Sequence, residues 1–400
     1  MSLAFGRPQL SIPGPSIFPD RVLNAMHRAA PNIYEGEIID LTARIKTDLQ
    51  DVARTKGEAL IYIANGHGGW EAALSNIVNR GDVILSLETG RFTFGWAEMA
   101  RDLGAEIETI DFGTNTSIDP QRVEDHLRAD SAGRIKAILA VHTDTASGVR
   151  NDIRALRAAI DAAGHPALLM IDCIASLACE PFEMDDWGVD IMVAGSQKGL
   201  MTPPGLAFNF VNDKAIAARK SCTQTPGYWD WTMRLDPEIY YMNFYGTAPT
   251  HHLYGLGVAL DILLREEGLE AAWRRHDILA GAVWAAIAAW GKGGSIRCNV
   301  ADPGMRSTAV TSVLIDPEFA EPLRNWTDSQ CGLTLGVGLG LDNDLNARAP
   351  GLFRIGHMGH LNPPMILGAL ATIDTGLKAL NIPHGAGAIE AATGHIAGLI

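Results

Sequence analysis

Short apolar runs alternate with amphipathic stretches between about residues 55 and 265 of this chain. The apolar runs predict strands at 83–87, 107–110, 135–141, 167–171, 191–193 and 206–210. The amphipathic stretches predict helices at 92–103, 120–128 and 153–163. Strands that are apolar throughout and separated by helices are typical of a mostly parallel sheet covered on both faces. The pattern therefore predicts an α/β fold.

The last third of the chain has a different pattern. A helical pattern runs through 256–290, and we expect this helix to link two domains. Beyond it, helical segments mix with short strands such as 312–315, which predicts a smaller α+β domain. A glycine-rich stretch at 383–388 precedes a final helix. The predicted organisation is an N-terminal arm at 1–20, a large domain at 21–265 and a small domain at 266–400.

Composition narrows the classes of partner. The 400 residues carry a formal net charge of -14, which argues against nucleic acid or an anionic membrane surface. No apolar stretch reaches the ~18 residues that span a bilayer, and the first residues lack a signal-peptide pattern. The cysteines lie without CxxC spacing at Cys173, Cys179, Cys222, Cys298 and Cys331. We therefore expect a cytoplasmic protein without a disulfide framework or a zinc site.

The most informative residue is Lys198, which follows a predicted buried strand. An unpaired ammonium is costly to bury there, and a covalent bond to an aldehyde cofactor would remove its charge. Asp172, at the end of an earlier strand, is a suitable partner for the ring nitrogen of pyridoxal phosphate. Alternatively, Lys198 extends its amine to the surface and Asp172 caps a helix. These two residues alone leave both interpretations open.

Other segments could surround a ligand at the carboxyl ends of the strands. The glycine-rich segment 64–72 opens a helix and suits an anion, although packing alone explains many such turns. Phe92 could stack on a planar ring or pack in the core. The polar loop from His142 to Gly148 could face a ligand or cap the next helix. His142, like Asp172 and Lys198, follows a predicted strand, so the three could converge.

Arg354 stands between apolar residues and needs a partner. A guanidinium fixed in this way can hold a substrate carboxylate, and the alternative is an internal salt bridge. The histidines at 251–252 and 357–360 lack acidic residues at ligand spacing, so we expect no metal site.

Taken together, these segments resemble the fold-type I, class V pyridoxal-phosphate-dependent aminotransferases. The resemblance is greatest to the group of serine–glyoxylate, alanine–glyoxylate and serine–pyruvate aminotransferases. It covers most of the chain, from the segment 13–16 to the Arg354 motif. The matching elements occur in the same order as in the family, at 68–74, 172–176, 195–200, 335–339 and 354–357.

The resemblance implies a role for each matching residue. Lys198 and Asp172 would be catalytic, with Lys198 bound to the cofactor and later moving the substrate α-proton. The implied cofactor-binding residues are Asn65, Gly66, His67, Phe92, Thr145, Asp172, Ile174, Gln197, Lys198 and Thr247. The implied substrate-binding residues are Arg354, Pro15 and Ser16. Thr247 would reach the phosphate of a neighbouring subunit, which implies a homodimer with its sites at the subunit interface.

The implied activity is ping-pong transamination between a small amino acid, such as serine or alanine, and a 2-oxo acid, such as glyoxylate or pyruvate. Several departures from the family pattern lie near the substrate, and they leave the donor and the acceptor open. Ile17 stands where the group usually has asparagine, and 33–36 replaces a His-Arg-Ser-like segment. Phe244 replaces a common tyrosine, Asn65 replaces a serine, and 342–349 is an apparent insertion.

The same residues leave three alternative functions to consider. A pyridoxamine–pyruvate aminotransferase shares the 354–359 motif and the His142 loop, but would carry an arginine in the glycine loop, which reads Gly338-Leu339-Gly340 here. A cysteine desulfurase-like lyase would need a mobile cysteine, and we expect Cys331 to be buried before a strand. A non-catalytic cofactor-binding module would not need Lys198, Asp172 and Arg354 together, and no DNA-binding domain is appended.

Overall fold

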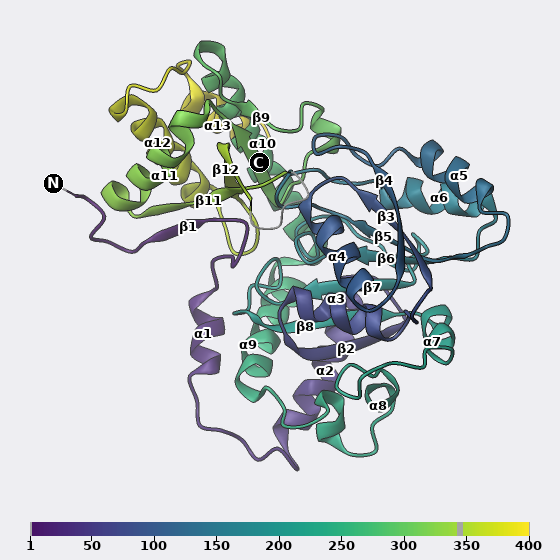
Figure 1. Ribbon diagram of the computed structural model, residues 1–400. Coiled ribbons are helices and arrows are strands. Elements are labelled where there is room, and N and C mark those ends of the chain that lie inside the picture. Colours follow the sequence, from purple (N-terminus) through teal and green to yellow (C-terminus); the bar gives the residue numbers. More distant parts are fainter. Residues whose placement is uncertain (1, 342–346, 400) are drawn as a thin grey trace.

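The computed structural model describes residues 2–341 and 347–399, so most of the apparent insertion predicted at 342–349 lies outside the described residues. Two sheets organise these residues (Figure 1). The larger has the strand order β2-β8-β7-β6-β5-β3-β4. Its strands are β2 (Glu58–Ala64), β3 (Val83–Glu88), β4 (Glu106–Asp111), β5 (Ile135–Val141), β6 (Leu168–Asp172), β7 (Ile191–Gly195) and β8 (Gly205–Val211).

The strand directions confirm the mostly parallel sheet. β3 pairs in parallel with β4 and β5, and β6 pairs in parallel with β5 and β7. β8 is antiparallel to both of its neighbours, β7 and β2, so β2 points the same way as β7. The carboxyl ends of β2, β5, β6 and β7 therefore meet at one edge of the sheet.

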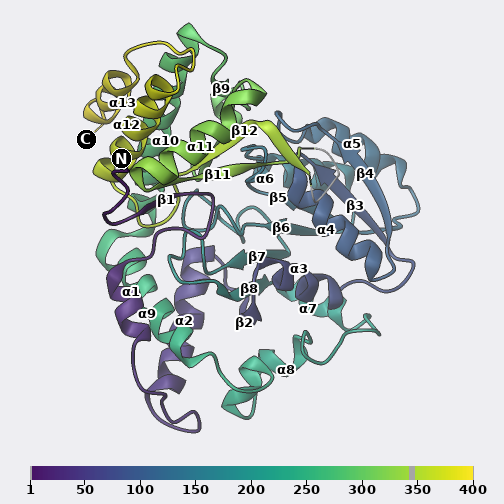
Figure 2. The same cartoon turned by 60° about the vertical axis from the view of Figure 1, so that its left-hand side comes forward.

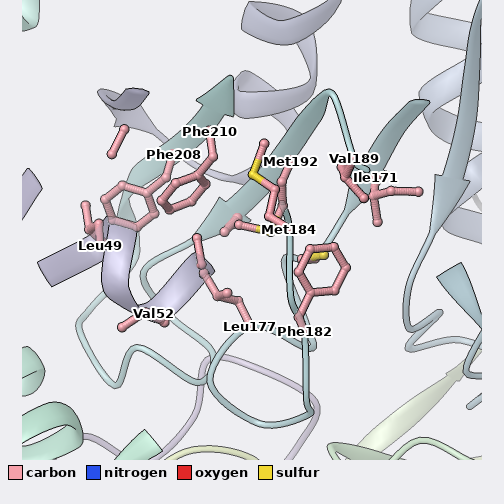
Figure 3. Close-up of a cluster of buried hydrophobic side chains, with 14 of the residues drawn as sticks. Leu49, Val52, Ile171, Leu177, Phe182, Met184, Val189, Met192, Phe208 and Phe210 are labelled. Atoms are coloured by element: carbon pink, nitrogen blue, oxygen red, sulfur yellow. The ribbon is translucent and has the colours of Figure 1, made fainter. Parts of the chain in front are cut away.

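Helices cover both faces of this sheet because alternate strand residues point to opposite sides. One face packs against α2 (Glu37–Ala53), α5 (Pro120–Ala129), α6 (Ile153–Ala163) and α9 (Thr250–Asp261). The other packs against α3 (Gly66–Ser75), α4 (Arg91–Asp102) and α7 (Asp213–Arg219). Figure 3 shows the first core, where Leu49 and Val52 of α2 lie near Phe208, Phe210 and Met192 of the sheet.

The smaller sheet has the order β1-β11-β12-β10-β9. Its strands are β1 (Gln9–Ser11), β9 (Arg297–Cys298), β10 (Val310–Leu314), β11 (Leu333–Leu339) and β12 (Arg348–Gly356). The helices that share its core are α10 (Leu269–Trp290), α11 (Pro317–Cys331), α12 (Pro363–Ala379) and α13 (Ala388–Ala397). β1 pairs in parallel with β11, so part of the predicted N-terminal arm is an edge strand of this sheet (Figure 2).

The connection between the two sheets differs from the single helix predicted at 256–290. α9 ends at Asp261, and a short π-helical turn, Ile262–Glu267, leads to Gly268. Gly268 has a φ of +88°, which glycine adopts without steric cost, and α10 begins directly after it. The apolar pattern continued through this break because α9 and α10 both bury apolar faces.

The remaining elements connect these layers. They are α1 (Asp20–Met26), α8 (Thr232–Leu235) and the 3-10 turns Tyr240–Phe244, Gly291–Gly293 and Pro303–Met305. Over the described ranges, no helix is both long enough and apolar enough to cross a membrane.

Candidate active site

A cavity of about 180 Å³ lies where β2, β5, β6 and β7 end. Its walls are Asn65, Gly66, His67, Trp70, Phe92, Thr143, Thr145, Asp172, Ile174, Ala175, Gln197 and Lys198. Nine of the ten predicted cofactor-binding residues belong to this set, Thr247 being the exception. The geometry brings them together because parallel strands deliver their following loops to one edge of the sheet.

Asp172 is the last residue of β6 and is buried. Its Oδ1 accepts the N–H of Ile174 at 2.6 Å, and its Oδ2 accepts the indole N–H of Trp70 at 3.1 Å. Burial raises the pKa of Asp172 to about 7, although these two hydrogen bonds favour the charged form. The carboxylate is thus held in one orientation, and a cation in the cavity would relieve the cost of its burial.

Trp70 is one of three wall residues, with Thr143 and Ala175, that the sequence analysis did not name as cofactor-binding. It lies in α3, is fully buried and stacks on Trp96 with ring centroids 5.9 Å apart. The segment 68–74 contains it, but its hydrogen bond to Asp172 joins residues 102 positions apart. A buried indole N–H needs an acceptor, and this requirement is the one signal that could have pointed to a carboxylate.

Lys198 follows β7 and reaches back toward the segment after β1. Its ammonium donates a hydrogen bond to the Pro13 carbonyl. Gly14 has a φ of +104°, a conformation that favours glycine. A Cβ at this position would also overlap the end of the Lys198 side chain. Burial lowers the pKa of Lys198 to about 8, and the positive charge of Arg354 adds to this effect. The amine is therefore easier to deprotonate, and the surface alternative for Lys198 is wrong.

The first turn of α3 forms another part of the cavity wall. It favours an anion, whereas Asp172 favours a cation. Asn65 caps this helix by accepting the N–H of Gly68 at 3.2 Å. The leading N–H groups of a helix lack intrahelical acceptors and favour an anion. A Cβ on Gly66 would lie 2.5 Å from the side chain of Ile174, so glycine lets these two wall residues pack closely. Gln197, another wall residue, has a buried Oε1 without a hydrogen-bond partner among the described residues.

Phe92 lies at the start of α4, with its ring at the cavity and edge-on to Trp70 at 6.2 Å. Its backbone N–H donates to Oδ2 of Asp144 at 2.8 Å. Asp144 also accepts the N–H groups of Ala146 and Ser147 through Oδ1. This buried carboxylate therefore fixes the Phe92 backbone relative to the loop that carries Thr145.

Arg354 comes from β12 in the smaller sheet and is 7% exposed. Its Nε donates to the Val337 carbonyl at 2.7 Å, and one terminal nitrogen donates to the Thr145 carbonyl at 2.8 Å. Within the described residues it forms hydrogen bonds to carbonyls and no ion pair, contrary to the salt-bridge alternative. Burial lowers its pKa to about 10, so the guanidinium stays charged near neutral pH beside the cavity wall at Thr145.

The other predicted site residues lie around the cavity. Ser16 is buried and donates from its hydroxyl to the Lys198 carbonyl at 2.8 Å, which fixes the lysine backbone. Pro15 precedes it. Thr247 is exposed on the turn before α9. Cys331 is half-buried at the end of α11, and the strand predicted after it is β11, so a fully buried thiol was the wrong expectation.

Histidines of the segments 251–252 and 357–360, which the sequence analysis considered as metal ligands, bond to protein groups. His357 bonds to Thr311 at 2.8 Å and to the Thr308 carbonyl at 2.9 Å. His251 lies 3.0 Å from the Arg28 carbonyl. In the described ranges, no three side chains of the ligand types His, Cys, Asp and Glu gather as a metal centre would require.

Comparison with known proteins agrees with this geometry. Residues 16–333 match the family model described as aminotransferase class-V. A serine–glyoxylate aminotransferase of Methylorubrum extorquens is 38% identical over 386 residues, 93% of each chain. An L-aspartate–glyoxylate aminotransferase of Paracoccus denitrificans is 32% identical over 380 residues, 93% of this chain and 91% of that one. The crystal structure of pyridoxamine-pyruvate aminotransferase from Mesorhizobium loti superimposes with a TM-score of 0.88 at 27% identity, covering 100% of both chains.

Proposed function

This chain belongs to the class V aminotransferase family, and on that premise we propose that it moves an amino group from a small amino acid to a 2-oxo acid. Pyridoxal 5′-phosphate is the cofactor, and the fold is fold type I. The proposed donors are serine, alanine or a similar amino acid, and the proposed acceptors are glyoxylate and pyruvate. The observation that carries the proposal is the shared cavity of Lys198 and Asp172, with the N-terminus of α3 in the same wall.

The residues present fit the cofactor. The buried carboxylate of Asp172 would hold a protonated ring nitrogen, because a cation is what its environment lacks. The N–H groups at the N-terminus of α3 and the side-chain NH₂ of Gln197 would hold the phosphate by donating hydrogen bonds. Phe92 would stack on the ring. When bound, the cofactor supplies a ring that accepts electrons from the substrate α-carbon.

Lys198 performs the proton chemistry in this proposal. Its lowered pKa makes the neutral amine available near pH 8. Nζ would hold the cofactor until the amine of the substrate displaces it, and the freed Nζ would then accept the substrate α-proton. Its backbone is fixed by Ser16, so the flexible part is the side chain alone. The Pro13 carbonyl and the close approach of Gly14 hold the amine at the cavity wall.

Arg354 would bind the substrate carboxylate. Two hydrogen bonds to carbonyls fix the plane of its guanidinium, and the charge has no carboxylate partner in the described part of the chain. A fixed guanidinium offers the paired donors that a carboxylate accepts. Because Arg354 belongs to the smaller sheet and Lys198 to the larger one, the substrate would lie between the two sheets.

We propose that the enzyme is a cytoplasmic homodimer with Thr247 at the partner's cofactor. Thr247 is exposed on its turn. The large apolar side chains of Tyr34, Ile63, Ile239 and Tyr245 are also exposed, by 76%, 43%, 51% and 42%. Such residues are suited to an interface. The five cysteines are free thiols, as a reducing compartment favours. Sedimentation velocity would test the dimer, and a monomer at micromolar concentration would overturn it.

One observation disfavours the alternative of a pyridoxamine–pyruvate aminotransferase. The glycine loop reads Gly338-Leu339-Gly340 without the arginine expected of that enzyme, and a Cβ on Gly338 would overlap the carbonyls of Leu352 and Ala349. The phosphate-binding character of Asn65 and Gly66 also persists.

The visible absorption of the purified holoenzyme tests the function. L-serine, L-alanine, L-aspartate and pyridoxamine are added separately, and glyoxylate or pyruvate is then added to each. Loss of the cofactor band with one amino acid, and its return with a 2-oxo acid, would establish both half-reactions and identify the donor. A response to pyridoxamine alone would contradict the proposal and favour the alternative.

A further inference from the structure

A second cavity, of about 210 Å³, borders the loop that carries Thr143 and Thr145 to the active site. Its inner wall includes His142 and Asn151, and Trp187 forms an aromatic side. Its rim includes Asp152, Pro181 and Gly304, which are exposed. The cavity therefore opens to solvent at the junction of the two sheets, separately from the cavity of Lys198.

His142 lines this cavity and carries a buried polar atom that has no partner in the described part of the chain. The side chain is 3% exposed, and its Nδ1 has no hydrogen-bond partner among the described residues. Its Nε2 lies 4.0 Å from Glu180, and the ring packs against Phe182 and Trp187 at 5.2 and 6.0 Å. Buried polar atoms in native proteins nearly always have a partner, so His142 is a candidate to bind a group that enters the neighbouring cavity.

Arg150 brings a cation to the same cavity. Its backbone N–H donates to the Met305 carbonyl at 2.8 Å, so its position is fixed at the junction with the smaller sheet. One terminal nitrogen donates to the Gly304 carbonyl at 3.1 Å. In the described ranges the guanidinium forms no ion pair, and it has five N–H donors in all. Donors thus remain for a ligand.

We propose that this cavity is a second ligand site, which binds a small carboxylate through Arg150 and His142. A planar guanidinium matches a carboxylate, and an imidazole nitrogen supplies one further hydrogen bond. Asp152 at the rim disfavours an ion with more than one negative charge, such as phosphate. The indole of Trp187 gives a short carbon chain an apolar surface.

Two kinds of molecule share this chemistry, an amino acid and a 2-oxo acid. An amino acid would in addition place its ammonium near Asp152. Either ligand would contact Arg150, which is joined to Met305, and His142, which is three residues from Thr145. The site is thus placed to report the concentration of such molecules to the active site.

Fluorine NMR of the holoenzyme with 5-fluorotryptophan tests the proposal. Trp187 lies in the second cavity and Trp70 in the first, so each site has its own reporter. Acetate is the probe, titrated against sodium chloride at equal ionic strength, and Trp187→Phe and Trp70→Phe assign the two signals. Arg150→Met removes the proposed cation, and Arg154→Met, an exposed arginine of the same helix region, is the matched control.

The expected result is a saturable shift of the Trp187 signal, with an affinity at least about tenfold weaker in Arg150→Met and unchanged in Arg154→Met. Tighter binding of glycine than of acetate would assign amino acids, and tighter binding of pyruvate would assign 2-oxo acids. Absence of a saturable shift at Trp187, or the same affinity in Arg150→Met, would overturn the site. The Trp70 signal reports the active site independently, so neither result depends on the proposed aminotransferase reaction.

Discussion

Two groups of buried polar side chains lie on either side of the loop at 142–148, and the protein satisfies their hydrogen-bonding groups to different degrees. At the active site, Asp172 is buried and accepts one hydrogen bond at each oxygen, and Lys198 is half-buried and donates one. Burial shifts the pKa of each toward its neutral form. At the junction of the two sheets, both oxygens of Glu180 are occupied. They accept from Thr143 at 2.9 Å, and from the Ser307 hydroxyl and Thr308 N–H at 2.6 and 2.9 Å.

The difference separates groups that stabilise the fold from groups that are kept for a ligand. Glu180 is a carboxylate whose three hydrogen bonds join the two parts of the chain and offset part of the cost of its burial, although burial still raises its pKa. Protein groups compensate the charges of Asp172 and Lys198 less, and a bound cofactor would supply the missing partners. Substitutions at the two places should therefore have opposite effects on stability and activity.

The largest effect is expected for Lys198→Ala. This change removes both the nucleophile and the base, so kcat/KM should fall by at least about 10⁴-fold while the protein stays folded. Steady-state kinetics measure the loss, and circular dichroism checks the fold. Lys220→Ala, at an exposed lysine, is the control and should keep full activity. Activity within tenfold of the wild type in Lys198→Ala would exclude the proposed mechanism.

Asp172→Asn should have the next largest effect on catalysis. Asparagine keeps the shape and an acceptor oxygen but removes the charge that would hold a protonated ring, so we expect kcat/KM to fall by roughly 10²- to 10³-fold. Asp190→Asn is the matched control, because Asp190 is also buried but pairs with Lys214 at 3.1 Å. Its replacement should lower stability more than activity, and the reverse order would contradict the contrast drawn here.

Glu180→Ala should lower the free energy of unfolding by about 3 kcal/mol, because it leaves three buried donors without their acceptor. Urea denaturation of the holoenzyme measures this loss. Glu180→Gln keeps an acceptor for Ser307 and Thr308 and should lose about 1 kcal/mol or less. Glu183→Ala, at a half-buried side chain 3.9 Å from Arg54, should change stability by less than about 0.5 kcal/mol. Equal losses of stability in Glu180→Ala and Glu183→Ala would contradict the special role of Glu180 in stabilising the fold.

The smallest effect has the opposite sign and concerns the cofactor-free protein. The pKa of Lys198 is lowered from 10.5 to about 8, so its burial destabilises the fold fully below pH 8 and less as the pH rises toward 10.5. Lys198→Met should therefore raise the free energy of unfolding at pH 7, by on the order of 2 kcal/mol, with a smaller gain at pH 10. Urea denaturation at the two pH values measures both.

Asp172 supplies the complementary test. Its pKa is raised from 3.8 to about 7, so its cost is absent below pH 4, grows as the pH rises and is complete above pH 7. Asp172→Asn should stabilise the cofactor-free protein above pH 7 and leave it unchanged near pH 4. A loss of stability in both variants at pH 8 would show that these residues support the fold as Glu180 does.

The local pattern of the sequence was sufficient for the elements and for the ends of the strands. The strand predicted at 135–141 and the helix predicted at 153–163 match β5 (Ile135–Val141) and α6 (Ile153–Ala163). Asp172 and Lys198 could be selected because a charged residue at the end of an apolar run is a local feature. The parallel sheet followed as well, since it depends on the same alternation of strand and helix.

The tertiary structure alone decided which groups are satisfied. The bond from Trp70 to Asp172, the bond from Ser307 to Glu180 and the cavity that Arg150 shares with Trp187 and Gly304 join segments that no periodicity connects. The helix predicted at 256–290 is interrupted at Gly268, because the packing of α9 and of α10 outweighs the local preference for a continuous helix. Hydrophobic periodicity records which face of an element is buried, whereas the partner of a buried polar group is set by the arrangement of the elements in space.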